Sequence, residues 1–259
     1  MSQASVTART EVDSLGTIEI PRNCLYGINT ARGRENFAIS HRALGEEPAL
    51  VRALARVKMA AAMANREIGA LPPDIVDAIV TACTEIVAGK HSEYFVIDML
   101  EGSGGTSINM NANEVVANRA LQIFGQSPGD YRNIHPNDHV NLGQSTNDVV
   151  PTALKIACYD QAQLLLDALS MLAGALEGKS SEFVDVLRLG RTCLQAAQPM
   201  TLGQAIGGYA TAVTRARDKI AGSANDLLIV PLGGTAIGTG LGASDGYREA
   251  ALRHLAQIT

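Results

Sequence analysis

The sequence predicts a mainly α-helical protein. Hydrophobic residues make up 46% of the 259 residues, but aromatic residues make up only 4% and Trp is absent, so Ala, Leu, Val and Ile must fill the core. This composition suits closely packed helices better than a β-sandwich, which depends on aromatic and β-branched side chains. Apolar residues also recur at helical spacing along most of the chain, and two of the helical segments are unusually long for a globular protein.

Charge and cysteine content narrow the function classes. The net charge is −5 and no basic face is evident, so neither nucleic acid nor an anionic membrane is an expected partner. No apolar run approaches the roughly 20 residues that a membrane helix needs. The opening MSQASVTARTEVDS has no apolar stretch and is not expected to be a secretory signal. The four cysteines are widely spaced without metal-ligand pairing, which predicts free thiols in a cytoplasmic protein: Cys24, Cys83, Cys158 and Cys193.

The first elements are short strands and two helices. Residues 10–47 are expected to be irregular with short strands, of which 17–20 alternates and stops at Pro21. A helix is expected at 48–70, with these residues at helical spacing: Leu50, Leu54, Val57, Ala61, Ala64 and Ile68. The Pro72-Pro73 pair starts a second helix that ends at Gly89 and has this apolar face: Ile75, Ile79, Cys83, Ile86 and Val87.

Three further helices are expected. One spans 107–124, between loops at 102–105 and 125–138. A long one spans 148–177, roughly 30 residues or about 45 Å, with Pro151 tolerated in its first turn. Its apolar residues extend beyond one stripe and predict packing between subunits: Leu164, Leu165, Leu166, Leu169, Met171 and Leu172. Another long helix is expected at 199–230, where three glycines would allow close backbone approach: Gly203, Gly207 and Gly208.

Hydroxyl-rich segments precede three of these helices and are candidate anion sites, because a helix N-terminus exposes free N–H groups at its positive dipole end. At the start of the first long helix, Asp148 is a plausible cap. This leaves Ser145, Thr146 and Asn147 free to bind a ligand. The other two segments are GSGGTS, which ends in Thr106 and Ser107, and Gly190-Arg191-Thr192 before CLQAAQPMTLGQ.

Each such segment has an ordinary interpretation as a helix cap and turn. Other motifs have similar alternatives. The glycine-rich 233–242 lacks the Gly-Lys-Ser/Thr ending of a phosphate loop and predicts a flexible structural loop. His135 and His139 are spaced for a metal, but Pro136 disfavours a helix there, and hydrogen bonding within a loop is the preferred interpretation. Cys193 has no base nearby in sequence, so we expect a small buried residue rather than a nucleophile.

A series of motifs in order resembles the aspartase/fumarase superfamily. The motifs include DSLGTIEIP, LYGINTARGRENF, KMAAAMANRE, GGTSINMNANEVVANRAL, HPNDHVN, QSTNDVVPTALKIA, LGRT, QPMTLGQ and LGGTAIGTGL, and they span nearly the whole chain. GTSINMN and QSTND follow the aspartase form, whereas fumarases tend to have GTQSNMN and QSSND.

The resemblance implies a fold and an assembly. It implies an N-terminal lyase domain at 1–140 and part of a central helical-bundle domain at 141–259. It also implies a homotetramer assembled through that bundle, with each active site shared by three subunits.

The resemblance also implies anti elimination of ammonia from aspartate to give fumarate, without cofactor or metal. A proton leaves the carbon beside a carboxylate, and the resulting aci-carboxylate carries doubled negative charge that positioned donors stabilise. By motif, Thr106, Ser145 and Thr146 would hold this carboxylate and Asn147 the amino group. The other carboxylate would bind at Thr192, with Cys193 beside it. A secondary carboxylate site would use His135, Asn137 and Asp138.

Departures from the family pattern leave three functions open. Cys193 replaces a usual His or Gln, Ala196 replaces an Asp, Glu101 replaces a frequent Gln, and His135 is fumarase-like. The family's general base, a Ser in a GSSxMPxKxNP loop, has no counterpart in this sequence, so no catalytic residue is assigned and residues 1–259 alone are expected to be inactive. The alternatives are fumarate hydratase or another superfamily lyase, and a non-catalytic assembly or dicarboxylate-binding protein.

Overall fold

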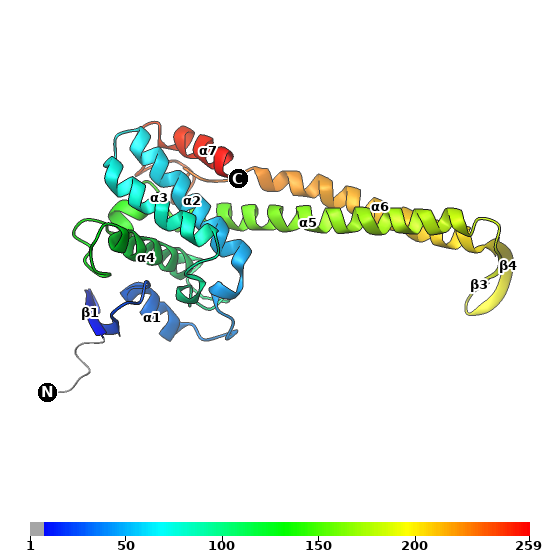
Figure 1. Ribbon diagram of the computed structural model, residues 1–259, viewed down its shortest axis with the longest axis horizontal. Helices are drawn as coiled ribbons and strands as arrows, with labels where there is room; N and C mark the ends of the chain where they lie inside the picture. Colours follow the sequence, from blue (N-terminus) through cyan, green and yellow to red (C-terminus); the bar gives the residue numbers. More distant parts are fainter. Residues whose placement is uncertain (1–7) are drawn as a thin grey trace. The chain divides into compact units, whose positions relative to one another are not determined.

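The chain is mainly α-helical in the computed structural model, which describes residues 8–259 (Figure 1). Its contacts define two compact units, one made of residues up to Ala157 together with Val230–Thr259, and the other of Cys158–Ile229. This division differs from the domains expected at 1–140 and 141–259. Those domains were expected from the resemblance to the family, and they remain a prediction. The opening segment was not expected to be a secretory signal, and its residues 1–7 lie outside the described part of the chain.

A two-stranded antiparallel ribbon opens the first unit. Strand β1 (Ala8–Asp13) pairs with β2 (Gly16–Pro21) in a register that places Asp13 opposite Gly16. Gly16 has φ +120°, a conformation that favours glycine in the tight turn. The predicted strand at 17–20 is therefore confirmed, and Pro21 ends it.

The first unit is otherwise built from helices, and two of them, at Ile28–Asn36 and Tyr247–Ile258, lie where the sequence predicted no helix. Its α-helices are α1 (Ile28–Asn36), α2 (Pro48–Glu67), α3 (Pro73–Val87), α4 (Thr106–Ile123), the start of α5 (Thr146–Glu182) and α7 (Tyr247–Ile258). Short helical turns connect them: η2 (Leu44–Glu46), η3 (Ser92–Tyr94) and the π-helical η4 (Pro136–Val140). The expected helices at 48–70, 73–89 and 107–124 are confirmed to within three residues at each end.

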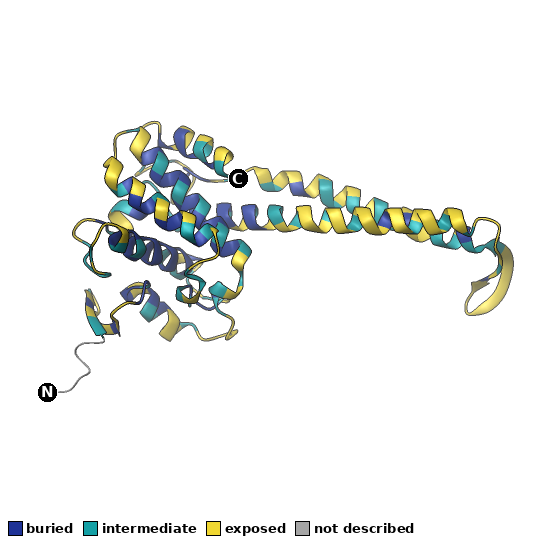
Figure 2. Cartoon of the chain, in the orientation of Figure 1, coloured by how far each residue is buried: buried dark blue, intermediate teal, exposed yellow. Residues whose placement is uncertain are grey.

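The core of the first unit lies between α2, α3 and α4. Small side chains on α2 are fully buried and allow the neighbouring helices to come close: Ala53, Ala60, Ala61 and Ala64. Helix α7 packs against α2 as well, and the ring of Tyr247 is fully buried. Figure 2 shows many buried residues on α2 and α4, and among them are the buried polar residues Lys58, Asn109 and Glu114.

The second unit contains most of α5, a hairpin and α6 (Leu202–Asn225), followed by the turn η5 (Asp226–Leu228). The expected helix at 199–230 is confirmed as α6, which starts three residues later and ends five residues earlier than predicted. Residues 187–192 and 195–201 form the antiparallel strands β3 (Leu187–Thr192) and β4 (Gln195–Thr201), which the sequence analysis missed. Helix α6 begins after Thr201, whose hydroxyl accepts the Gln204 N–H at 3.0 Å while the Gln204 side chain accepts the Thr201 N–H at 3.0 Å.

Glycines bring the end of α5 against the start of α6. The Gly203 N–H donates to the Phe183 carbonyl at 2.9 Å, and a Cβ at Gly203 would lie 2.8 Å from the Cα of Val184. A Cβ at Gly207 would lie 2.9 Å from the Ser180 hydroxyl oxygen, whereas one at Gly208 would meet nothing within 4 Å. The predicted close approach is therefore confirmed for two of the three glycines.

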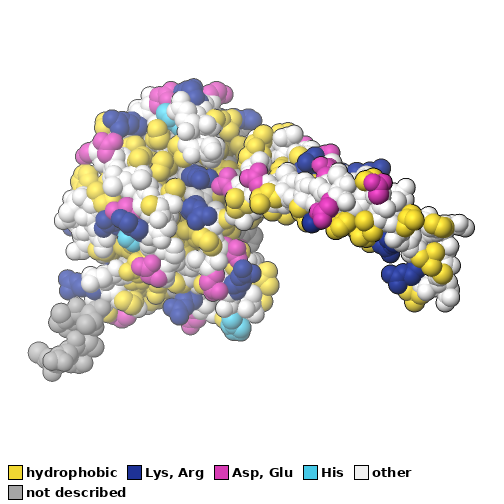
Figure 3. Space-filling view, turned by 45° about the vertical axis from the view of Figure 1, so that its right-hand side comes forward, with side chains coloured by type: hydrophobic (Ala, Val, Ile, Leu, Met, Phe, Trp, Pro, Cys, Tyr) yellow, Lys and Arg dark blue, Asp and Glu magenta, His cyan; other side chains and the backbone are white. Residues whose placement is uncertain are grey.

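The helices of the second unit expose large apolar side chains (Figure 3). Leu164 is 64% exposed, Met171 78% and Tyr209 65%, while Leu166 and Leu169 are half-buried. Within residues 8–259, no helix combines the length and hydropathy required to cross a membrane.

Candidate functional site: two convergent helix starts

The loop before α4 is held by Glu101. One of its carboxylate oxygens accepts the Ser103 N–H at 3.0 Å and the Ser103 hydroxyl, and the other accepts the Gly105 N–H. A glutamine has only one acceptor oxygen, so Glu101 secures this loop in a way that the more usual Gln would not. Thr106 follows as the exposed first residue of α4, after Gly105 at φ +93°.

Ser145 caps α5, so the expectation that Asp148 is the cap was wrong. The N–H of Val149 donates to the Ser145 carbonyl at 3.0 Å, and the N–H of Asn147 donates to the Ser145 hydroxyl at 3.2 Å. Asp148 lies in the first turn and accepts the Ser145 N–H at 2.9 Å, so the backbone N–H of the cap residue is also satisfied. Ser and Asp are both strong capping residues, and the sequence does not show which of them precedes the first turn.

Capping does not consume the donor capacity of Ser145. A hydroxyl has two lone pairs and one O–H bond. The cap occupies a lone pair, so the O–H proton remains available to an anion at the N-terminus of α5. Negative charge is favoured there by the helix dipole.

The glycine-rich loop at 233–242 closes over this helix start. The second oxygen of Asp148 accepts the N–H groups of Gly233 at 3.2 Å and Thr235 at 2.9 Å. The Asn147 side-chain nitrogen donates to the Ala236 carbonyl at 2.8 Å. The expectation that the Asn147 side chain is free of other contacts was therefore wrong. These contacts give the loop the structural role that the sequence predicted.

The starts of α4 and α5 converge. Asn109, in the first turn of α4, donates from its amide nitrogen to the Thr146 hydroxyl oxygen at 3.3 Å. A Cβ at Gly105 would lie 3.3 Å from the Thr146 methyl group and 3.2 Å from Val150. Two of the three hydroxyl-rich segments, those of Thr106 and of Ser145 and Thr146, are therefore brought together in the first unit.

A buried lysine lies behind this convergence, and sequence reasoning missed it. Lys58 of α2 is fully buried, and its ammonium donates to the side-chain oxygens of Asn109 at 2.8 Å, Asn141 at 2.9 Å and Gln144 at 2.9 Å. Burial lowers the pKa of Lys58 to about 7, against an opposing effect of Asp148. The sequence could have indicated that Lys58 is buried, because Lys58 lies four residues from each of two buried apolar residues, Leu54 and Ala62, and so shares their face of α2.

Thr192 and Cys193 lie in the second unit, at the tip of the β3–β4 hairpin. Thr192 pairs with Gln195 in the hairpin. The expectation that Thr192 lies just before a helix was therefore wrong. Cys193 and Leu194 form the two-residue turn with φ +46° and +64°, as a type I′ hairpin turn requires. Cys193 is exposed, so the expectation of a small buried residue was wrong.

The proposed secondary carboxylate residues lie at η4. The His135 Nδ1 accepts the N–H groups of Asn137 at 3.1 Å and Asp138 at 3.2 Å, while the His135 N–H donates to the ring of His139 at 2.9 Å. Burial, the largest effect, lowers the pKa of His139. His135 and Asn137 border a cavity of about 330 Å³, together with Tyr131.

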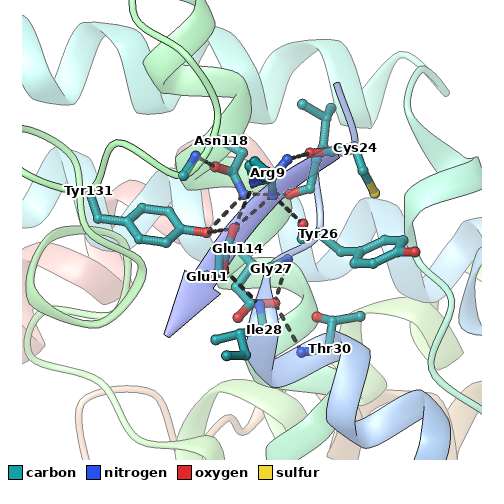
Figure 4. Close-up of polar contacts among 12 residues, drawn as sticks. Arg9, Glu11, Cys24, Tyr26, Gly27, Ile28, Thr30, Glu114, Asn118 and Tyr131 are labelled. Carbon is teal, nitrogen blue, oxygen red and sulfur yellow. Dashed lines mark hydrogen bonds and ion pairs between the residues drawn. The ribbon is translucent and has the colours of Figure 1, made fainter. Parts of the chain in front are cut away.

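Two buried carboxylates, Glu11 and Glu114, line part of that cavity and cap α1 (Figure 4). Glu114 of α4 accepts the N–H groups of Gly27 at 2.8 Å and Thr30 at 3.0 Å, and Glu11 of β1 accepts that of Ile28 at 2.8 Å. Burial raises the pKa of Glu114, and hydrogen bonds from Thr30 and Asn29 oppose the increase. Both carboxylates are therefore engaged in positioning α1, although a buried acid beside a cavity resembles a catalytic base.

Comparison with known proteins places this geometry in a family. A sequence model described as "Lyase" matches residues 16–259. The chain belongs to the aspartase/fumarase superfamily of lyases. An aspartate ammonia-lyase from Pseudomonas aeruginosa is 48% identical over 254 residues, which are 98% of this chain and 54% of that protein. A class II fumarate hydratase from Halobacterium salinarum is 46% identical over 252 residues, 97% of this chain and 53% of that protein.

Solved structures agree with this superfamily assignment. A crystal structure titled fumarate lyase:delta crystallin from Brucella melitensis bound to cobalt superimposes with a TM-score of 0.94 at 49% identity, over 97% of this chain and 55% of the other. The chain thus spans about half the length of the relatives it matches. Among residues 8–259, no group of three His, Cys, Asp or Glu side chains lies close enough to hold a metal ion.

Proposed function

We propose that the protein is an aspartate ammonia-lyase and that the starts of α4 and α5 bind the substrate carboxylate on which charge develops. The observation that carries this proposal is the convergence of the segment of Thr106 with Ser145 and Thr146. The hydroxyls of Ser145 and Thr146 each accept one hydrogen bond, so each still has its proton to donate to a ligand. The aspartate ammonia-lyase at 48% identity supports the choice of reaction.

Removal of a proton beside a carboxylate produces an aci-carboxylate with doubled negative charge. Donors that are already fixed stabilise this charge most at the transition state, because they need no reorganisation there. Ser145 is fixed by its hydrogen bonds with Asn147 and Asp148, and Thr146 by its hydrogen bond with Asn109. Both hydroxyls belong to the first turn of α5, whose dipole favours the developing anion.

The remaining roles follow the family motifs. Asn147, whose side-chain nitrogen donates to Ala236, binds the amino group through its side-chain oxygen, and Thr192 binds the second carboxylate beside Cys193. From the family resemblance, we propose that the complete site draws on several subunits. His135, Asn137 and Asp138 form a secondary carboxylate site. The general base belongs to the family's serine loop, so a polypeptide of residues 1–259 alone is proposed to be inactive; neither cofactor nor metal takes part.

Fumarate hydratase is the second candidate, because a class II fumarate hydratase is 46% identical to the chain. The two reactions are distinguished by following fumarate formation from aspartate, malate and argininosuccinate with the protein expressed from its complete reading frame. Turnover of aspartate alone supports the proposal, and turnover of malate but not aspartate contradicts it. Dicarboxylate binding without turnover of any of the three would indicate a non-catalytic binding protein.

We also propose a cytoplasmic homotetramer. The exposed apolar side chains of α5 and of Tyr209 on α6 form an apolar surface that association would cover. All four cysteines are free thiols, and Cys24 and Cys83 are buried. Free thiols are typical of a reducing compartment.

A further inference from the structure

Lys58 is a buried cation held only by neutral side-chain oxygens. Its three hydrogen bonds, to Asn109, Asn141 and Gln144, match the three N–H bonds of an ammonium group. A buried charge compensated by amides rather than by a carboxylate is costly to desolvate. Such an arrangement therefore calls for a functional reason as well as a structural one.

The hydrogen bond from Lys58 fixes which way the Asn109 amide points. Because the amide oxygen of Asn109 accepts from Lys58, its nitrogen must face the opposite side, where it lies 3.3 Å from the Thr146 hydroxyl oxygen. That N–H occupies a lone pair of Thr146. The Thr146 proton must then be donated elsewhere, and a carboxylate, which offers only acceptors, is the matching ligand.

We propose that Lys58 is a positioning residue of the carboxylate site: it orients Thr146 through Asn109 and supplies a positive charge behind the bound carboxylate. This inference rests on the proposed function, because it takes Thr146 as a substrate contact. It assigns a role to Lys58 of KMAAAMANRE and to its three partners, Asn109 of GTSINMN, Asn141 of HPNDHVN and Gln144 of QSTND.

The charge of Lys58 gives the proposal a measurable signature. Its pKa is about 7, so a substantial fraction is neutral at and above neutral pH. The titratable groups that act on it are Asp148 at the start of α5 and Cys83 of α3, and burial keeps the Cys83 thiol protonated by raising its pKa to about 12. A dicarboxylate at Thr146 favours the ammonium form, so binding is expected to take up protons above neutral pH.

The test measures succinate binding, since succinate is a four-carbon dicarboxylate that cannot undergo the elimination. Isothermal titration in buffers of different ionisation enthalpy reports both affinity and proton uptake for the protein from its complete reading frame. Wild type is expected to take up protons, and Lys58→Met to bind about tenfold more weakly without uptake. Asn65→Leu is the matched control, because Asn65 is also buried on α2 and donates to Leu142 of the same segment at 2.9 Å; it should retain the uptake.

Unchanged affinity in folded Lys58→Met, or proton uptake that persists in it, would overturn the proposal. If Lys58→Met does not fold, Asn109→Ser carries the test, since it removes the amide link but keeps the lysine. Weaker binding with retained uptake then supports the proposal, and unchanged affinity overturns it. If the wild-type protein binds no succinate, the carboxylate site itself is wrong. This outcome differs from failure of the Lys58 proposal, because it is seen without any variant.

Discussion

At the start of α5, one hydroxyl has both a structural and a chemical role. Ser145 caps the helix with a lone pair and keeps its proton for a ligand, whereas Thr146 makes no capping bond and accepts only from Asn109. This difference allows the two roles to be separated by mutation. It also explains why a segment that resembles an ordinary helix cap can be part of a binding site.

We predict different consequences for Ser145→Ala and Thr146→Val. Loss of one transition-state donor should lower the elimination rate of either variant by about a hundred- to a thousandfold. Only Ser145→Ala should also reduce the free energy of unfolding, by about 1 kcal/mol, because only Ser145 caps α5. Steady-state kinetics and urea denaturation measure the two effects. Normal rates in both variants would show that the hydroxyls serve the fold alone.

A second prediction at the residue scale concerns acid stability. Arg119 holds Glu85 with hydrogen bonds of 2.6 and 2.9 Å, and together with His91 lowers the pKa of Glu85 from 4.5 to about 2. Because the folded-state pKa is lowered, this stabilisation is present above the unfolded-state pKa and is lost as pH falls through the folded-state pKa.

Glu85→Gln should therefore be less stable than wild type at neutral pH, with the difference shrinking as pH falls from 4.5 toward 2. Urea unfolding across that range measures it. The control is Asp77→Asn, which removes an ion pair whose two side chains are 67% and 48% exposed and should change stability little. A constant difference between Glu85→Gln and wild type at every pH would contradict the assignment.

At the scale of elements, the β3–β4 turn holds two non-glycine residues in the left-handed region. Leu194 has φ +64° and is 94% exposed, so no packing compensates its backbone conformation. Leu194→Gly should stabilise the hairpin by about 1 kcal/mol, since glycine adopts this conformation without the steric cost. Hydrogen exchange of the β3 and β4 amides reports the change. Leu194→Ala keeps a Cβ and should not reproduce it; equal protection in both variants would argue against strain in the turn.

Helices α2 to α6 were predictable from sequence because apolar spacing and proline marked them, whereas α1, α7 and the β3–β4 hairpin were not predicted. Gly190 and Pro199 interrupt the strands and few β-branched residues occur there, so helix-forming Gln and Ala dominated the pattern. Of the site, the sequence alone gave the hydroxyls at the starts of α4 and α5. It did not predict Lys58, whose partners are distant in the chain, or that Ser145 rather than Asp148 caps α5, because both residue types are strong caps.

At the scale of the whole molecule, the second unit exposes the residues that we expect to meet in a subunit interface. Light scattering should show an oligomer, and Leu164→Glu combined with Leu172→Glu should weaken it, since these leucines are 64% and 48% exposed on α5. Leu241→Glu is the control, because Leu241 is 84% exposed but lies in the first unit. A stable wild-type monomer at micromolar concentration would refute the expected assembly.

The central claim is that the convergent starts of α4 and α5 bind the carboxylate during elimination of ammonia from aspartate. The most direct measurement is the absorbance of fumarate formed from aspartate by the protein from its complete reading frame, compared between wild type and Thr146→Val. We predict turnover by wild type and a loss of about a hundred- to a thousandfold in the variant. Undiminished turnover by Thr146→Val would contradict the account.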